Sequence, residues 1–207
     1  MLKEQDPVAS VTIWRPMSVA IAERLTAYPV PVATARLPAA EGGAPAEPGL
    51  YAWWLTDEHL LSAVPTSPHP ARPKLGLVYV GISPKDATSQ ETMRSRILTK
   101  HLGNALGSST LRRALASLLW EQEDWHPFMK GQKVAIMPDE CTALTRWMQR
   151  NLEVSWCPAA RAWDYEPTLI HDMLPPLNSH HNQNHPFYDD LDSARKYMLS
   201  VAGATVA

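Results

Sequence analysis

The sequence predicts an α+β fold in which a small three-stranded antiparallel sheet is flanked by helices, and three observations lead to it. Two short runs, GLYAWWL at 49–55 and LGLVYVGI at 75–82, consist mainly of aromatic, β-branched and other apolar residues, as buried strands do. A third run, EVSWCP at 153–158, alternates like a half-buried strand. Strands that follow one another in the chain pair antiparallel by default, because a parallel pair needs a crossover connection.

Apolar residues at helical spacing predict the helices around these strands. The first helix after the second strand has Met93, Ile97, Leu98 and Leu102 on one side, and Gly103 is a natural place for it to stop. The predicted helices cover residues 18–27, 92–103, 111–121, 139–152, 165–174 and 189–201.

The chain divides into three regions by this pattern. An N-terminal arm with a helix covers 1–47, a central domain covers 48–180, and a C-terminal loop and helix packed on that domain cover 181–207. The proline-rich stretch 65–73 is predicted to be a loop inserted between the first two strands, which costs little because loop-closure entropy grows only logarithmically with length. The stretch 120–151 either shapes a groove or serves only for packing.

Composition narrows the class of protein. The chain has 207 residues, of which 45% are hydrophobic, and this is enough for one domain with a full core. Its two cysteines cannot build a disulfide framework or a four-cysteine zinc site. No apolar run approaches the roughly 20 residues of a membrane span, and the N-terminus does not read as a signal peptide. We therefore expect a soluble cytoplasmic protein without a membrane partner.

Two tyrosines and a basic segment are candidates for function. Tyr51 and Tyr79 lie in apolar strands, where a phenol hydroxyl that leaves water must find a partner. The segment 91–113 has a local charge of about +4, because five cations face only Glu91. Although the net charge of the chain is −2, such a segment is either a solvated helix face or a local nucleic-acid-binding surface. The candidates for nucleic-acid binding are Arg94, Lys100, Arg112 and Arg113.

These residues, with others downstream, match the needs of phosphodiester hydrolysis. That reaction needs a ligand for a hard cation, a positive charge near the phosphate, and a group that positions or deprotonates water. Glu166 lies in the first turn of a predicted helix, and Asn178 follows the rigid pair Pro175-Pro176. The histidines at 171, 180, 181 and 185 suggest zinc, but no cysteine or acidic partner lies at a matching spacing, so a polar loop is the preferred interpretation.

In these residues the sequence resembles the GIY-YIG nuclease superfamily, over roughly 48–180. The two signature tripeptides appear as Gly49-Leu50-Tyr51 and Tyr79-Val80-Gly81. The helical arginine of the superfamily falls in MRSRI at 93–97. The remaining elements are a histidine at His101, a glutamate at Glu166 in YEPTLI, and an asparagine at Asn178 in PPLN.

The resemblance implies a divalent-metal-dependent DNA endonuclease on a GIY-YIG-like fold, with Mg²⁺ or Mn²⁺ as cofactor. It implies that Glu166 binds the single ion and that Arg96 steadies the pentavalent phosphate. Tyr51 or Tyr79 would position the attacking water. His101 would assist proton transfer or hold the phosphate, and Asn178 would order the site from behind.

The helical arginine is the point where the sequence departs from the family pattern. Arg96 and His101 are five residues apart instead of four, which turns about 140° around an ideal α-helix. Arg94 is seven residues from His101 and returns almost to the same face. Geometry therefore favours Arg94, whereas the register of the motif favours Arg96, which we choose. A local bulge in the helix would reconcile the two.

Two main functions follow, a DNA endonuclease and a catalytically silent nucleic-acid-binding module with the same fold. The shifted spacing between arginine and histidine motivates the second. A weaker third possibility is an interaction protein with a tryptophan-rich surface. A homodimer is possible, because many nucleases of this size cut both strands as dimers.

Overall fold

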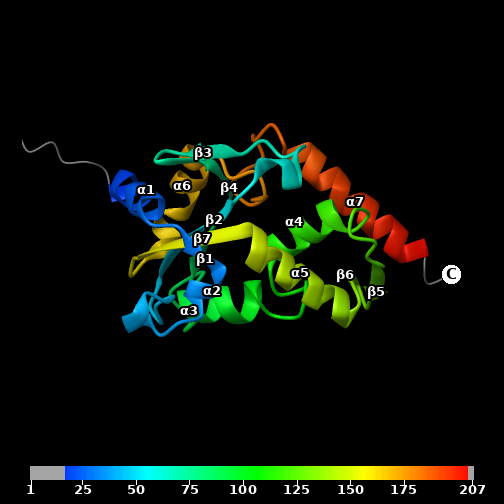
Figure 1. Cartoon of the computed structure of the whole chain (residues 1–207), viewed down its shortest axis with the longest axis horizontal. Helices are drawn as coiled ribbons and strands as arrows, with labels where there is room; N and C mark the ends of the chain where they lie inside the picture. The colour runs from blue at the N-terminus through cyan, green and yellow to red at the C-terminus, as the bar shows by residue number, and fades with distance from the viewer. Residues whose placement is uncertain (1–16, 205–207) are drawn as a thin grey trace, which may run out of the picture.

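A computed structural model describes residues 17–204 as an α+β fold (Figure 1). Within these residues, seven α-helices accompany a five-stranded antiparallel sheet of order β1-β7-β2-β4-β3 and a separate hairpin of β5 and β6. Residues 1–16 and 205–207, which belong to the predicted terminal regions, lie outside the described part. The strands are β1 (Val30–Pro31), β2 (Gly49–Leu55), β3 (Ser67–His69), β4 (Arg72–Ser83), β5 (Phe128–Lys130), β6 (Lys133–Ala135) and β7 (Leu152–Pro158).

The three predicted strands are confirmed as the centre of the sheet, where β2 lies between β4 and β7. The predicted number of strands is wrong, because β1 and β3 extend the sheet at its two edges. β1 comes from the N-terminal arm, and β3 comes from the stretch 65–73 that was expected to be a loop. Prolines do not exclude an edge strand, since its outer N–H groups have no ladder partner to lose.

Helices cover both faces of this sheet, which explains why every residue of β2 is buried. In Figure 1, α1 and α6 lie on one side of the strands, and α4, α5 and α7 lie on the other. The helices are α1 (Met17–Ala27), α2 (Val32–Ala35), α3 (Met93–Ser95), α4 (Thr110–Leu119), α5 (Pro138–Asn151), α6 (Glu166–Met173) and α7 (Tyr188–Ala204), with short 3₁₀ turns η1 (Ala39–Glu41), η2 (Glu58–Leu61) and η4 (Ala162–Asp164).

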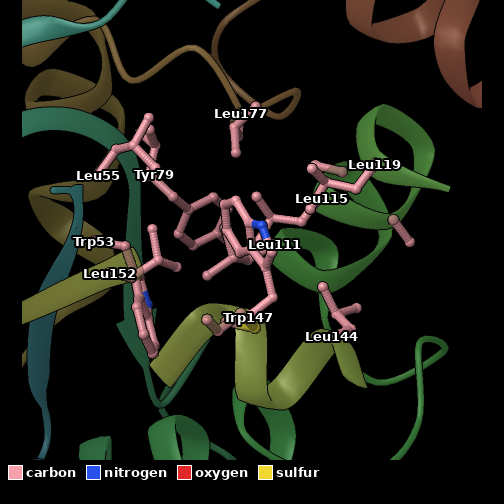
Figure 2. Close-up of a cluster of buried hydrophobic side chains, with 14 of the residues drawn as sticks. Trp53, Leu55, Tyr79, Leu111, Leu115, Leu119, Leu144, Trp147, Leu152 and Leu177 are labelled. Carbon is pink, nitrogen blue, oxygen red and sulfur yellow. The ribbon is translucent and has the colours of Figure 1, made fainter. Parts of the chain in front are cut away.

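The larger core cluster lies between the sheet and the helices α4 and α5. Figure 2 shows Trp53 and Tyr79 extending from the strands towards Leu111 of α4 and Trp147 of α5. All of these side chains are buried, and Tyr79 is 6% exposed. The tyrosine of the second strand is therefore part of the core and also reaches the cleft described below.

The predicted helix at 92–103 is a short α-turn that continues as a π-helix. After α3, the chain forms the π-helix η3 (Arg96–His101). The backbone N–H of Leu102 donates to the carbonyl of Ile97, five residues earlier, at 3.0 Å. The local bulge that would bring the arginine and the histidine into register is thus present.

The stretch 120–151 forms the β5-β6 hairpin and most of α5. The hairpin packs against α7, so this stretch builds surface next to the C-terminal helix. The tryptophans between 17 and 204 are buried or half-buried, so the proposed tryptophan-rich surface has no counterpart there. Within the same residues, no helix combines the length and the apolar character needed to cross a membrane.

Candidate active site

One cleft of about 510 Å³ gathers five of the six predicted catalytic residues. They reach it from β2, β4, η3, the first residue of α6 and the segment after Pro176. These residues are Tyr51, Tyr79, Arg96, Glu166 and Asn178. The sixth, His101, is fully buried and lies behind Tyr51. Segments far apart in the chain therefore converge on one wall.

The register of β2 and β4 explains where the two tyrosines point and why position 81 is a glycine. Tyr51 lies opposite Gly81, and Tyr79 lies opposite Trp53, so the two phenols lie on the same face of the sheet. A Cβ on Gly81 would lie 2.5 Å from Cζ and Oη of Tyr51. Glycine is needed at 81 because the Tyr51 ring occupies the space of a side chain there.

Burial raises the pKa of both phenols, and that of Tyr51 lies well above its usual range. The neighbouring Tyr79 raises the pKa of Tyr51 further, whereas the positive charge of Arg96 lowers both pKa values. Both side chains are therefore neutral hydroxyls that can donate and accept hydrogen bonds.

His101 is hydrogen-bonded at both ring nitrogens. Its Nε2 lies 2.7 Å from Oη of Tyr51, and its Nδ1 lies 2.7 Å from Oγ of Ser109. Burial, followed by the charges of Arg96 and Arg112, lowers the pKa of His101 well below its ordinary value. The ring is therefore neutral, and one of its nitrogens is free to accept a proton. The sequence did not identify Ser109 as part of the site, because Ser109 caps the next helix, α4, and the turn between η3 and α4 brings it to His101 only in the fold.

Arg96 combines partial burial with an unused donor. Its Nε is buried and has no hydrogen-bond partner among the described residues. Glu91 lies 3.6 Å from its Nη1 and forms a loose ion pair with it. An unpaired N–H in a cleft costs free energy until an acceptor arrives, so Arg96 is ready for an anionic oxygen.

Two of the four predicted nucleic-acid-binding cations have structural roles instead. The guanidinium of Arg94 donates to the carbonyls of Arg36, Leu37 and Ala44 and fastens the N-terminal arm to α3. Arg112 is fully buried and donates to the carbonyl of His101 and to other groups of the core. The prediction that Arg112 binds nucleic acid is wrong, since a residue without exposed surface cannot reach a nucleic acid. The same prediction for Arg94 loses its basis, because the hydrogen-bond donors of its guanidinium are already used within the protein.

The other two cations lie nearer to solvent. Arg113 is exposed and lines a second cleft next to the first. Lys100 is half-buried on η3 and lines neither cleft. Binding of nucleic acid by these two residues stays a prediction.

Asn178 fixes the strand that carries Tyr79. Its Oδ1 accepts from the backbone N–H of Val80 at 3.0 Å, and its Nδ2 donates to the carbonyl of Val80 at 2.8 Å. The amide thus pairs with β4 as a neighbouring strand would. Because Val80 lies between Tyr79 and Gly81, this contact supports the expectation that Asn178 orders the site.

Three side chains form a potential metal-binding group at the edge of the cleft. Donor atoms of Glu166, His180 and His181 all lie within 4.8 Å of one another. Burial raises the pKa of the Glu166 carboxyl, whereas the charges of His180 and Arg96 lower it. One carboxylate with two imidazoles is a donor set that suits a divalent cation, and the nitrogens suit transition metals in particular.

The loop that carries the two histidines is held in place. Asn182 donates to the carbonyls of Pro175 and Asn178, and His181 has the left-handed backbone φ of 59°. A strained residue of this kind persists only where its surroundings hold it. The sequence indicated a simple polar loop, because the acidic partner, Glu166, is remote in the chain and becomes a neighbour only in the fold.

This fold and these residues point to a nuclease-type hydrolase. A comparison with protein families supports the same class. The family model described as the GIY-YIG catalytic domain matches residues 49–197, well over half of the chain. The chain therefore belongs to the GIY-YIG family, whose nucleases are generally metal-dependent. The match includes all six predicted catalytic residues and extends into α7. Searches among curated proteins and solved structures gave no match.

Proposed function

We propose that this chain is a metal-dependent DNA endonuclease that hydrolyses a phosphodiester bond in the cleft between β2, β4, η3 and α6. The observation that carries the proposal is the convergence of two phenols, an arginine and a glutamate on one cleft. A histidine supports one of the phenols from the interior. Packing alone does not require these groups to meet, whereas phosphodiester hydrolysis uses each of them.

Arg96 would offset the negative charge that builds up on the phosphoryl oxygens. Its buried Nε supplies a donor that none of the described residues uses. Such a donor is worth most in a partly enclosed site, where water competes little for the charge. Arg96 is also held close to the phenols, since its charge acts on the pKa of both.

Tyr51 would position the attacking water and move its proton. As the water oxygen bonds to phosphorus and the bond to the leaving oxygen breaks, Oη of Tyr51 takes a proton from the water, and the leaving oxygen departs as an alkoxide that takes up a proton from solvent. The same Oη passes its own proton to Nε2 of His101, which lies 2.7 Å away. His101 is neutral and can accept this proton, and the negative charge that builds up on the phosphate would offset the lowered pKa of its ring. Tyr79 would hold the water or a phosphoryl oxygen from the other side.

The cofactor of this proposal is a divalent ion, Mg²⁺ or Mn²⁺, held by Glu166. When bound, it would supply Lewis-acid stabilisation of charge on the scissile phosphate. His180 and His181 would add nitrogen ligands, which favour Mn²⁺ and later transition ions over Mg²⁺. DNA is the proposed partner, and a homodimer would allow both strands to be cut.

The proposal is tested with supercoiled plasmid DNA in the presence of Mg²⁺ or Mn²⁺. We expect the parent protein to nick or cut the plasmid and Glu166→Gln to lose this activity while keeping its circular dichroism spectrum and melting temperature. Glu58→Gln is a matched control, because Glu58 also lies in the first turn of a helix but is exposed and away from the cleft. Cleavage by Glu166→Gln at the parent rate would show that the metal assignment is wrong.

The alternative of a catalytically silent binding module loses its main support. It was motivated by the five-residue spacing between Arg96 and His101, and the π-helix accommodates that spacing. The same plasmid experiment separates the two functions. Salt-dependent DNA binding by the parent protein, without cleavage under any divalent ion, would favour the silent module.

A further inference from the structure

A second cleft, of about 610 Å³, adjoins the candidate active site. It lies between α4, the β5-β6 hairpin and α7, and it shares two lining residues, Thr110 and Ser179, with the first cleft. Figure 1 shows these three elements together at the end of the molecule opposite α1. A polymer held in the first cleft can therefore continue into the second without leaving the surface.

The charge of the second cleft is entirely positive. It is lined by Arg113 of α4, Lys133 of β6 and Arg195 of α7, and none of the described residues around it is acidic. Ser117 and Gln132 add polar groups. Three cations from three separate elements, without a carboxylate between them, repel one another. An anion placed among them would offset this repulsion.

Arg195 is the residue that most needs such an anion. Its Nε and Nη2 are both buried, and neither has a hydrogen-bond partner among the described residues. A side-chain carboxylate is close in the chain, but Asp192 forms its ion pair with Lys196 at 2.8 Å. Burial and the charge of Arg113 lower the pKa of Arg195, yet a guanidinium stays protonated under these conditions. Two buried N–H groups without a partner on a half-buried cation are costly unless an acceptor completes them.

We propose that this second cleft binds a backbone phosphate of the nucleic acid whose neighbouring phosphodiester lies in the candidate active site, with Arg195 as its principal ligand. A guanidinium offers a planar pair of donors that matches two phosphate oxygens, and Arg113 and Lys133 complete a positive cradle. This inference rests on the proposed function, because it uses the same substrate. It gives α7 a role in binding the substrate and not only in packing.

The test measures the binding of a fluorescently labelled DNA duplex of about 20 base pairs, with EDTA present so that nothing is cut, over a series of salt concentrations. We expect Arg195→Gln to weaken binding by about tenfold or more, as the loss of a charged hydrogen bond does. The slope of log K against log salt should fall by about 0.9, the value for one lost phosphate contact. Lys133→Gln should act in the same direction with a smaller loss of affinity.

Two control variants each remove one positive charge close to the second cleft but not from its lining. Lys196→Gln alters the next residue of α7, which is exposed and paired with Asp192, and Lys130→Gln alters the residue opposite Lys133 in the hairpin. Neither lines the second cleft, so both should keep nearly the parent affinity and salt slope. Arg195→Gln should also melt at or above the temperature of the parent, because it removes a half-buried cation whose buried N–H groups have no partner.

Four outcomes would overturn the inference. Equal losses for Arg195→Gln and Lys196→Gln would mean a diffuse charge effect. A large fall in melting temperature with unchanged DNA affinity would make Arg195 a structural residue. If inorganic phosphate raises the melting temperature of the parent but not of Arg195→Gln, while DNA binding is unaffected, the cleft takes free phosphate instead. If the parent protein cuts DNA but Arg195→Gln binds DNA with the parent affinity, only this inference fails. A parent protein that neither binds nor cuts DNA would overturn the proposed function as well.

Discussion

Arg96 begins and His101 ends a π-helix, and burial, followed by the charge of Arg96, lowers the pKa of the His101 ring. In an α-helix, residues at this spacing point about 140° apart. The wider π turn returns the chain towards the same face after five residues. The π turn thus accommodates the five-residue spacing between the arginine and the histidine.

This relationship predicts opposite effects for the two arginines of the helix. Arg96→Ala should lower DNA cleavage by about 100-fold or more, because it removes a charged donor from the reacting phosphate, with little change in stability. Arg94→Ala should cut DNA normally but lose roughly 1–2 kcal/mol of stability, because it frees three backbone carbonyls that hold the arm. Cleavage rates and urea unfolding of both variants check this. A reversed pattern would transfer the catalytic role to Arg94.

The contact between Gly81 and Tyr51 predicts a second pair of effects. Gly81→Ala should destabilise the protein by about 1–3 kcal/mol and abolish cleavage, because the new Cβ would lie 2.5 Å from the Tyr51 ring. The ring cannot easily move, since it is buried and hydrogen-bonded to His101. Gly203→Ala is the control: a Cβ there meets nothing within 4 Å, and α7 should gain up to about 1 kcal/mol. Normal cleavage by Gly81→Ala would contradict the proposed role of Tyr51.

Buried His101 predicts a stability that falls in mild acid. Its pKa is lowered well below the ordinary value in the folded protein, so the unfolded chain takes up the proton first as pH falls below about 6.5. Proton uptake by the unfolded state favours unfolding, at up to about 1.4 kcal/mol per pH unit. The glutamine of His101→Gln takes up no proton in the unfolded chain. The stability of this variant relative to the parent should therefore rise as the pH falls from 7 to 5. Urea unfolding at several pH values measures the difference, and a difference that does not vary with pH would show that His101 titrates normally.

The histidines beside Glu166 predict a preference among metal ions. The double variant His180→Ala, His181→Ala should bind Zn²⁺ and Mn²⁺ at least about tenfold more weakly than the parent, whereas Mg²⁺, which prefers oxygen ligands, should change little. Calorimetry measures these affinities without any need for cleavage. His171→Ala is the control, because His171 is exposed on α6 and lies outside the metal-binding group. Unchanged Zn²⁺ affinity in the double variant would restrict the site to Glu166.

The central strands and most helices could be predicted from the sequence because their signals are local. Alternating and continuous apolar runs specify β2, β4 and β7, and a glycine beside each tyrosine marks the close packing found at Gly81. The edge strands escaped prediction. β1 and β3 are short and contain prolines, and they exist only because a neighbouring strand offers free backbone groups.

By itself, the sequence determined the α+β class, the three central strands and a set of candidate residues for phosphodiester hydrolysis. It could not distinguish Arg94 from Arg96, because the choice depends on a π turn that becomes visible only in the fold. It could not join His180 to Glu166 or Arg195 to Arg113, and it left Arg112 among the surface cations. Those relationships depend on which segments become neighbours in space. They also depend on which buried polar groups are left without a hydrogen-bond partner, and only the tertiary structure decides both.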